Sequence, residues 1–116
     1  MKKKFLPAFH GLMDGLRDPA VRIQICMAAA AMIAAWLFRF TAVETCVVVM
    51  AIGLVITAEI LNTCIERICD FVHPAHHEEI GRIKDLAAGA VLFASLCALA
   101  SGMIIVFRHL FGGIHL

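Results

Sequence analysis

The feature that most constrains this chain is a set of three long stretches without a charged residue, at 23–38, 45–58 and 86–107. A helix needs about 20 apolar residues to cross the hydrocarbon core of a bilayer. The third stretch has 22 residues and meets that length by itself. The chain is 62% hydrophobic, whereas soluble domains average about 45–50% apolar residues, and a domain this small cannot bury the excess. We predict an all-α membrane protein with three transmembrane helices.

The second stretch is too short to cross a membrane alone. Its 14 residues give about 21 Å of helix, against a hydrocarbon core of about 30 Å. The helix must therefore continue through Glu59 and Asn62. A carboxylate at the edge of a membrane is expensive to bury, and such residues are candidates for function.

An amphipathic segment precedes the first span. Its apolar residues recur at helical spacing and are Phe5, Phe9, Leu12, Met13 and Leu16. With three lysines ahead of them at 2–4, they predict a helix that lies on an anionic membrane surface. The alternative is the first turns of a longer buried helix. Asp18 followed by Pro19 favours a new helix start there, because Asp caps and Pro suits the first position.

These boundaries predict one domain over residues 1–116. It consists of a surface helix at about 4–17 and spans at about 19–39, 43–72 and 79–109. No cleavable signal peptide is evident, and the five cysteines form no CxxC pair. The net charge of +1 gives no reason to expect a nucleic-acid partner.

Basic residues predict the orientation in the membrane. Two of them, Arg39 and Arg108, would face one side in a three-span chain. Eight would face the other: Lys2, Lys3, Lys4, Arg17, Arg22, Arg67, Arg82 and Lys84. We therefore expect a multi-pass membrane protein with its N-terminus in the cytoplasm and its C-terminus outside.

Four polar residues share one face of the second span and its extension. Glu59, Asn62, Glu66 and Asp70 fall within a stripe roughly 80° wide at about 100° per residue. Stacked acidic groups repel one another unless a cation neutralises them. A solvated helix face is the alternative, which suits Asp70 and Glu66 better than Glu59, because 14 uncharged residues precede Glu59.

Lys84 and Asp85 stand across a short loop from this stripe, at the same mouth of the membrane. Lysine at the end of a span is commonly an interface anchor, but opposite an acidic stripe it indicates a phosphate-binding cation. We interpret the run 76–79, His-His-Glu-Glu, as a solvated loop rather than a metal site, because adjacent residues do not share a helix face, and place His77 near a nucleotide. No GxxxxGK[ST] loop or GxGxxG motif is present.

Small residues repeat every four positions in the third span. They are Ala90, Ala94, Ala98 and Gly102. Such a ridge lets transmembrane helices approach closely. It predicts that this span packs tightly against another helix.

Two stretches resemble the signatures of a known family. Residues 59–66, Glu-Ile-Leu-Asn-Thr-Cys-Ile-Glu, followed by Asp70, resemble the ExxNTxIExxxD motif of the prokaryotic diacylglycerol kinases and undecaprenol kinases. Residues 84–91, Lys-Asp-Leu-Ala-Ala-Gly-Ala-Val, are similar to the family's KDxAAGAV motif. The resemblance implies a homotrimeric membrane enzyme that moves the γ-phosphate of ATP to a lipid alcohol, with active sites shared between subunits at the cytoplasmic interface.

The resemblance also implies roles on the acidic stripe. Glu59 would be the catalytic base and Asn62 would organise the site. Glu66 would bind Mg²⁺ together with ATP. Lys84 and Asp85 would contact the nucleotide, and we place Asp70 and His77 on the nucleotide side as well.

A further acidic residue of the family precedes an arginine by four positions at the start of the first span. Here these are Asp18 and Arg22. The family usually has Glu at this position, so Asp18 is either a second metal ligand or only a helix cap. We place Arg22 beside the lipid substrate.

The acceptor lipid is the less defined part of the prediction. Residues 84–91 and 52–56 look more like the Gram-positive branch, which implies undecaprenol and the product undecaprenyl phosphate. The diacylglycerol branch, which makes phosphatidic acid, tends to carry a polar residue where this chain has Ala88, and we assign Ala88 to the lipid side. Two other classes stay open: a proton-coupled transporter subunit using Glu59, and a non-catalytic assembly protein using the small-residue ridge.

Overall fold

Residues 2–112 fold into four helices joined by short loops. The computed structural model describes residues 2–112, and the side chains of residues 5–112, so the prediction about the lysines at 2–4 lies outside the described side chains. The helices are α1 (Lys2–Leu16), α2 (Pro19–Leu37), α3 (Ala42–Val72) and α4 (Glu78–Leu110). The last three are long and apolar enough to cross a membrane. The prediction of an all-helical chain with three long apolar helices is confirmed.

Helix α2 begins and ends with recognisable caps. Asp18 accepts hydrogen bonds from the backbone N–H groups of Ala20 and Val21, at 3.1 and 3.4 Å. At the other end, the Arg39 N–H donates a hydrogen bond to the Trp36 carbonyl, and the Phe40 N–H donates one to the Ala35 carbonyl. These two hydrogen bonds together form a Schellman cap. Arg39 has a φ of 56°, at a position where glycine is usual.

Helix α3 carries the acidic stripe and is much longer than a membrane span needs. Thr41 and Glu44 form a capping box at its start. Its 31 residues extend about 46 Å, well beyond a hydrocarbon core of about 30 Å. The helix continues through Glu59 and Asn62, as the short uncharged run predicts.

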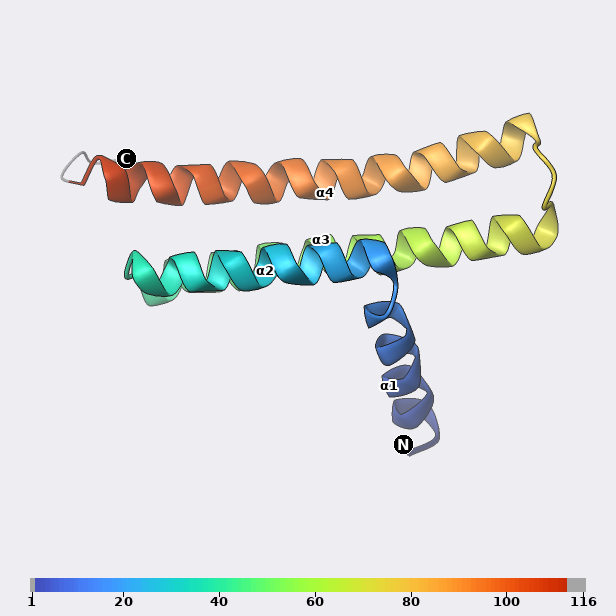
Figure 1. Cartoon of the computed structure of the whole chain (residues 1–116), viewed down its shortest axis with the longest axis horizontal. Coiled ribbons are helices and arrows are strands. Elements are labelled where there is room, and N and C mark those ends of the chain that lie inside the picture. Colours follow the sequence, from blue (N-terminus) through green and yellow to red (C-terminus); the bar gives the residue numbers. More distant parts are fainter. Residues whose placement is uncertain (1, 113–116) are drawn as a thin grey trace.

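Helices α2, α3 and α4 lie alongside one another, with α3 in contact with both others (Figure 1). Helix α4 runs antiparallel to α3 along most of its length, and α2 packs on α3 less extensively. Few side chains are buried, and the apolar ones are Val21, Ala35, Val55, Cys69, Ala87, Ala94 and Ile105. Most large apolar side chains are exposed, which suits helices whose surroundings are lipid or other helices.

The predicted small-residue ridge is correct only in part. Ala94 is buried, and Ala98 and Gly102 are half-buried, but Ala90 is exposed. The contact with α3 instead passes through Ala87, Ala94 and Ile105. A four-residue repeat rotates by about 40° at each step and drifts off a straight contact line. The spacings of 7 and 11 residues between Ala87, Ala94 and Ile105 return to nearly the same helix face.

Helix α1 leaves the other three at a steep angle (Figure 1). It ends at Leu16 and is separated from α2, so the alternative of one longer helix is wrong. Its apolar residues Phe5, Phe9 and Leu12 are exposed. Gly15 is buried and lies close to Ile60. A Cβ atom added at Gly15 would be only 3.2 Å from Ile60 Cγ1.

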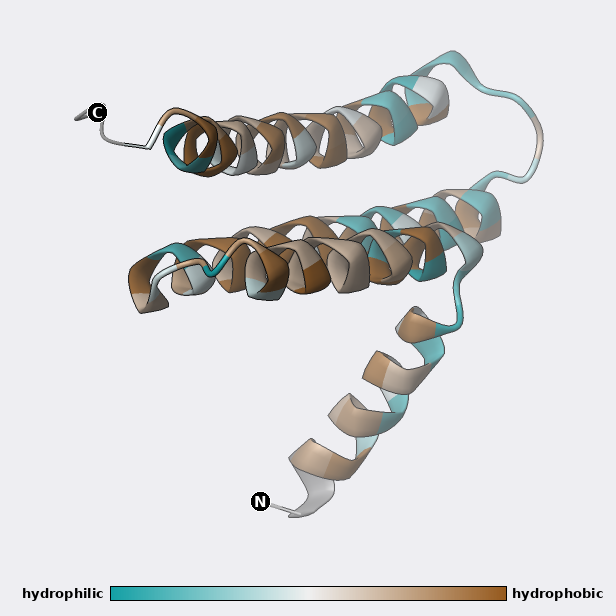
Figure 2. Cartoon of the chain, turned by 60° about the vertical axis from the view of Figure 1, so that its left-hand side comes forward, coloured by the Kyte–Doolittle hydropathy of each residue, from teal (hydrophilic) through white to brown (hydrophobic). Residues whose placement is uncertain are grey.

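Hydrophilic residues gather at one end of α3 and α4 and where α1 joins α2 (Figure 2). We call this the polar end, and it includes Asp18, residues 59–70 and residues 84–85. The opposite end, called the far end, includes residues 38–45 and 108–110. The middle of the helices is apolar.

Candidate functional site at the polar end

The acidic stripe of α3 is divided between a buried part and an exposed part. Glu59 and Asn62 are each only 8% exposed, whereas Glu66 and Asp70 are exposed. The stripe begins where α3 is packed against other helices and ends near the loop at 73–77, so its first residues are buried and its last are exposed. The stripe therefore offers a buried carboxylate beside carboxylates that remain accessible.

Asn62 connects the two parts of the stripe. Its Nδ2 donates a hydrogen bond of 3.0 Å to Glu66 Oε1, one turn further along α3. Its Oδ1 is buried and has no hydrogen-bond partner within the described part of the chain. An unsatisfied buried acceptor costs about 1–3 kcal/mol, so this atom is suited to accept a bond from a donor that is not in this chain, such as a hydroxyl.

Two other carboxylates lie near Glu59. Asp18, at the start of α2, and Glu66, on α3, both lie close enough for their charges to act on Glu59. Three carboxylates from two helices thus share one region. Their like charges repel one another.

Lys84 joins the second predicted motif to the stripe. Its Nζ forms an ion pair of 2.5 Å with Asp70 Oδ1, which ties the first turns of α4 to the last turns of α3. Asp85 is exposed beside it. The structure therefore brings the two motifs together, as the prediction of a shared membrane mouth requires.

Asp18 acts as a helix cap in this structure. Both bonds from the first turn of α2 are accepted by Asp18 Oδ2. The other oxygen, Oδ1, accepts no hydrogen bond from the described residues and is left for another contact. The cap and a metal contact are thus geometrically compatible at Asp18. The metal role stays a prediction.

The remaining predicted residues lie around the edge of this region. His77 caps α4, where its Nδ1 accepts a bond of 3.1 Å from the Glu79 N–H, and its ring meets that of His73 edge-on. Arg22 and Ala88 are exposed on α2 and α4. No hydrogen bond ties either side chain to the stripe within residues 5–112.

One contact of the polar end cannot be predicted from the sequence pattern. Arg67 forms an ion pair of 2.8 Å with Asp14, which fastens α1 to α3. The hydrogen bond from Arg67 lowers the pKa of the Asp14 carboxyl below its ordinary value. The two residues are 53 positions apart, and no motif or periodicity in the sequence relates them.

Comparison with known proteins identifies relatives over most of the chain. A family described as Prokaryotic diacylglycerol kinase matches residues 7–106. The diacylglycerol kinase of Escherichia coli strain K12 is 33% identical over 85 residues, which cover 73% of this chain and 69% of that protein. The undecaprenol kinase of Bacillus subtilis strain 168 is 29% identical over 104 residues, covering 89% and 85%. A Synechocystis diacylglycerol kinase is 35% identical over 82 residues, covering 70% and 47%.

Proposed function

Because the chain belongs to the prokaryotic diacylglycerol kinase family and is a multi-pass membrane lipid kinase, we propose that it transfers the γ-phosphate of ATP to undecaprenol. The product is undecaprenyl phosphate. Diacylglycerol, which would give phosphatidic acid, is the alternative acceptor. The proposal places the reaction at the polar end.

The observation that carries this proposal is the position of Glu59. It is a buried carboxylate on a membrane-length helix, and we propose that it meets a lipid hydroxyl at the edge of the bilayer. A positioned carboxylate can accept the hydroxyl proton as the oxygen attacks the γ-phosphorus. In our proposal, Glu59 is this base, and the buried Oδ1 of Asn62 accepts a hydrogen bond at the same place.

The other side chains of the polar end would hold the nucleotide. Lys84 is placed to exchange its bond with Asp70 for a phosphate oxygen, since phosphoryl transfer needs cations on the triphosphate. Asp85 and His77 lie near it in sequence and complete the proposed nucleotide side. Arg22 and Ala88 are proposed for the lipid side.

The carboxylates of the polar end suit Mg²⁺, which prefers hard oxygen ligands. No group of three or more acidic, histidine or cysteine side chains is placed to hold a metal within the described residues. Mg²⁺ is usually held by one or two carboxylates, several waters and the substrate phosphates. We propose Glu66 and Asp18 as its protein ligands, and the ion would neutralise the triphosphate charge when bound.

The choice of acceptor rests on the stretch around Ala88. An alanine there leaves an apolar surface beside the proposed site, which suits an isoprenoid alcohol better than a diacylglycerol headgroup. Relatives of both names match this chain. Their names favour a lipid alcohol as acceptor without separating the two lipids.

The assembly and orientation follow as parts of the same proposal. An apolar cavity of about 220 Å³ opens between α2, α3 and α4, and the large exposed apolar area around it supports contacts with further helices. We propose a homotrimer in the bacterial inner membrane, with sites shared between subunits. The polar end and the N-terminus would face the cytoplasm, where ATP is available.

The Glu59→Gln variant tests the proposal that Glu59 is the general base. Glutamine preserves the shape but is no longer basic, and loss of a general base typically lowers a rate about 10²–10⁴-fold. We expect such a loss of phosphoryl transfer by the purified variant, with unchanged thermal unfolding. Glu79→Gln, at an exposed carboxylate of α4, is the matched control and should stay active. Near-normal turnover by Glu59→Gln would exclude Glu59 as the base.

A further inference from the structure

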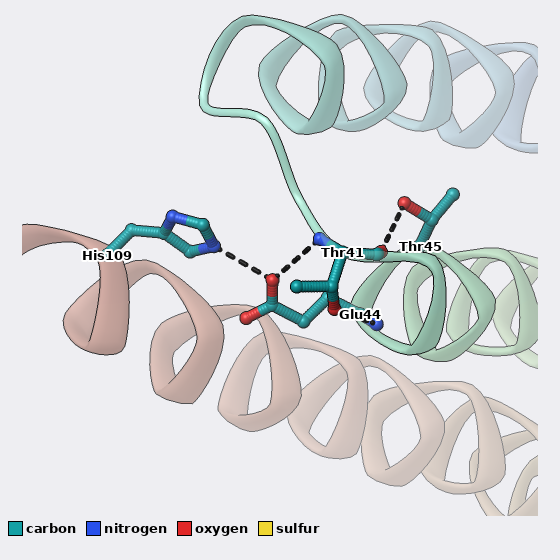
Figure 3. A network of polar contacts seen from close by, with 4 residues as sticks. All are labelled: Thr41, Glu44, Thr45 and His109. Carbon is teal, nitrogen blue, oxygen red and sulfur yellow. Dashed lines mark hydrogen bonds and ion pairs between the residues drawn. The ribbon is translucent and has the colours of Figure 1, made fainter. Parts of the chain in front are cut away.

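A polar network ties α3 to α4 at the far end, opposite the proposed site. Glu44 Oε1 accepts hydrogen bonds from the backbone N–H of Thr41 and from His109 Nε2, both at 2.9 Å (Figure 3). The bond to Thr41 lies within α3 and belongs to its capping box. The bond to His109 crosses to α4, from a residue 65 positions away.

The setting of this pair is more specific than a cap requires. Glu44 is 7% exposed, and the His109 ring stacks on Phe40 with 4.9 Å between the ring centroids. Phe40 is held in place by the Schellman cap of α2. Three helix ends thus meet at the one imidazole.

The pair at the far end matches the ion pair at the polar end in spacing. Asp70 follows Glu44 by 26 residues on α3, and His109 follows Lys84 by 25 residues on α4. At 1.5 Å per residue, these separations are about 39 and 38 Å. In an antiparallel helix pair, one register therefore satisfies both contacts, and a shift by one turn, about 5.4 Å, would break both.

The surface between the two pairs does little to fix that register. Its buried apolar side chains are Val55 and Cys69 on α3 and Ala87, Ala94 and Ile105 on α4. Small and aliphatic side chains allow close approach of helices but offer no directional bond. The two polar pairs are the directional contacts between α3 and α4 among the described residues.

We propose that Glu44 and His109 are positioning residues, which set the register of α4 on α3 and thereby hold Lys84 beside the acidic stripe. The register itself does not depend on the reaction. Its consequence for nucleotide binding rests on the proposed function. Loss of the far-end bond would let the start of α4 move along α3.

Cys69 reports on this movement without any assay of activity. It is the one buried cysteine of the five, and it lies on α3 beside Asp70 and near Lys84. A maleimide should alkylate Cys69 slowly while α4 covers it, and faster when the register loosens. The full-length protein is alkylated in bilayer nanodiscs and then digested. Mass spectrometry of the peptides gives the alkylation rate of Cys69 relative to that of the exposed Cys64.

Three variants separate the far-end bond from general damage. His109→Phe keeps a ring to stack on Phe40 but cannot donate to Glu44, and it should raise the relative alkylation of Cys69 several-fold. His109→Gln retains a side-chain N–H donor and should restore the slow rate. Arg108→Gln changes the exposed neighbour of His109 and should match wild type. Unchanged Cys69 alkylation in His109→Phe, or equal acceleration in Arg108→Gln, would overturn the proposal.

Kinetics test the consequence for the site separately. If Lys84 binds phosphate, His109→Phe should raise the KM for ATP by about tenfold, the loss of one hydrogen bond to a charged group, with a smaller change in kcat. His109→Gln should restore the KM. Faster Cys69 alkylation with an unchanged KM would support the positioning role of His109 and contradict the proposed role of Lys84. An unchanged alkylation rate with a raised KM would contradict the proposal that His109 sets the register of α4 on α3.

Discussion

Asn62 serves the two halves of the acidic stripe with different atoms. Its Nδ2 holds Glu66, while its buried Oδ1 has no partner in the described chain. An amide can do both because it carries a donor and an acceptor. The sequence predicts the residue as part of the stripe, but only the fold reveals that its buried oxygen has no partner among the described residues.

At Glu66, removal of the negative charge should weaken the proposed metal site. We expect Glu66→Gln to raise the Mg²⁺ concentration needed for half-maximal activity, because one anionic ligand is lost from a hard-cation site. The measurement is a Mg²⁺ titration at fixed ATP. Glu78→Gln, at an exposed carboxylate outside the stripe, serves as the control. An unchanged titration with activity otherwise intact would rule out direct coordination by Glu66.

Asp18 can be tested by two substitutions that separate capping from metal binding. Asn caps a helix about as well as Asp, so Asp18→Asn should preserve thermal stability but lose most activity at limiting Mg²⁺. Asp18→Glu is a poorer cap that keeps the charge, and it should retain activity. If the Asn variant behaves like wild type and the Glu variant only unfolds at a lower temperature, Asp18 is structural.

At the scale of the helices, the hydropathy pattern predicts most of what is observed. The break in the second uncharged run predicts that α3 continues past Glu59, because a shorter helix could not cross a bilayer. Contacts between helices are less predictable. Arg67 with Asp14, and His109 with Glu44, join residues 53 and 65 positions apart, and no local periodicity carries that information.

The attachment of α1 to α3 should weaken in acid. The pKa of Asp14 is lowered by Arg67 in the folded protein, so the pair stabilises the docked helix fully above the ordinary carboxyl pKa of about 3.9. That contribution is lost as pH falls through the lowered value. Hydrogen exchange of α1, relative to α4, should therefore increase below about pH 4.

Asp14→Asn is the control for this acid transition. It removes the titrating group, so its α1 should exchange faster than wild type at neutral pH and show no further loss of protection in acid. Both residues are exposed, and salt should reduce the difference. An acid transition of the same size in Asp14→Asn would assign the effect to other groups.

At the scale of the whole molecule, the described chain is open rather than compact. It measures 56 × 39 × 22 Å, and its polar end and far end are separated by the length of the apolar helices (Figure 2). The sequence predicts this division, because charged residues cluster at the ends of the uncharged stretches. The acceptor lipid and the trimer are not set by one chain's packing, since both would contact surfaces that are exposed here.

The measurement that tests the central claim most directly is lipid phosphorylation by the purified protein. [γ-³²P]ATP and Mg²⁺ are supplied in detergent micelles with undecaprenol or diacylglycerol in parallel, and the extracted lipids are counted. We expect ATP-dependent label in the lipid fraction, with undecaprenol labelled faster. Faster labelling of diacylglycerol would reverse the acceptor assignment. No label in either lipid, from protein that is folded by thermal unfolding, would contradict the account.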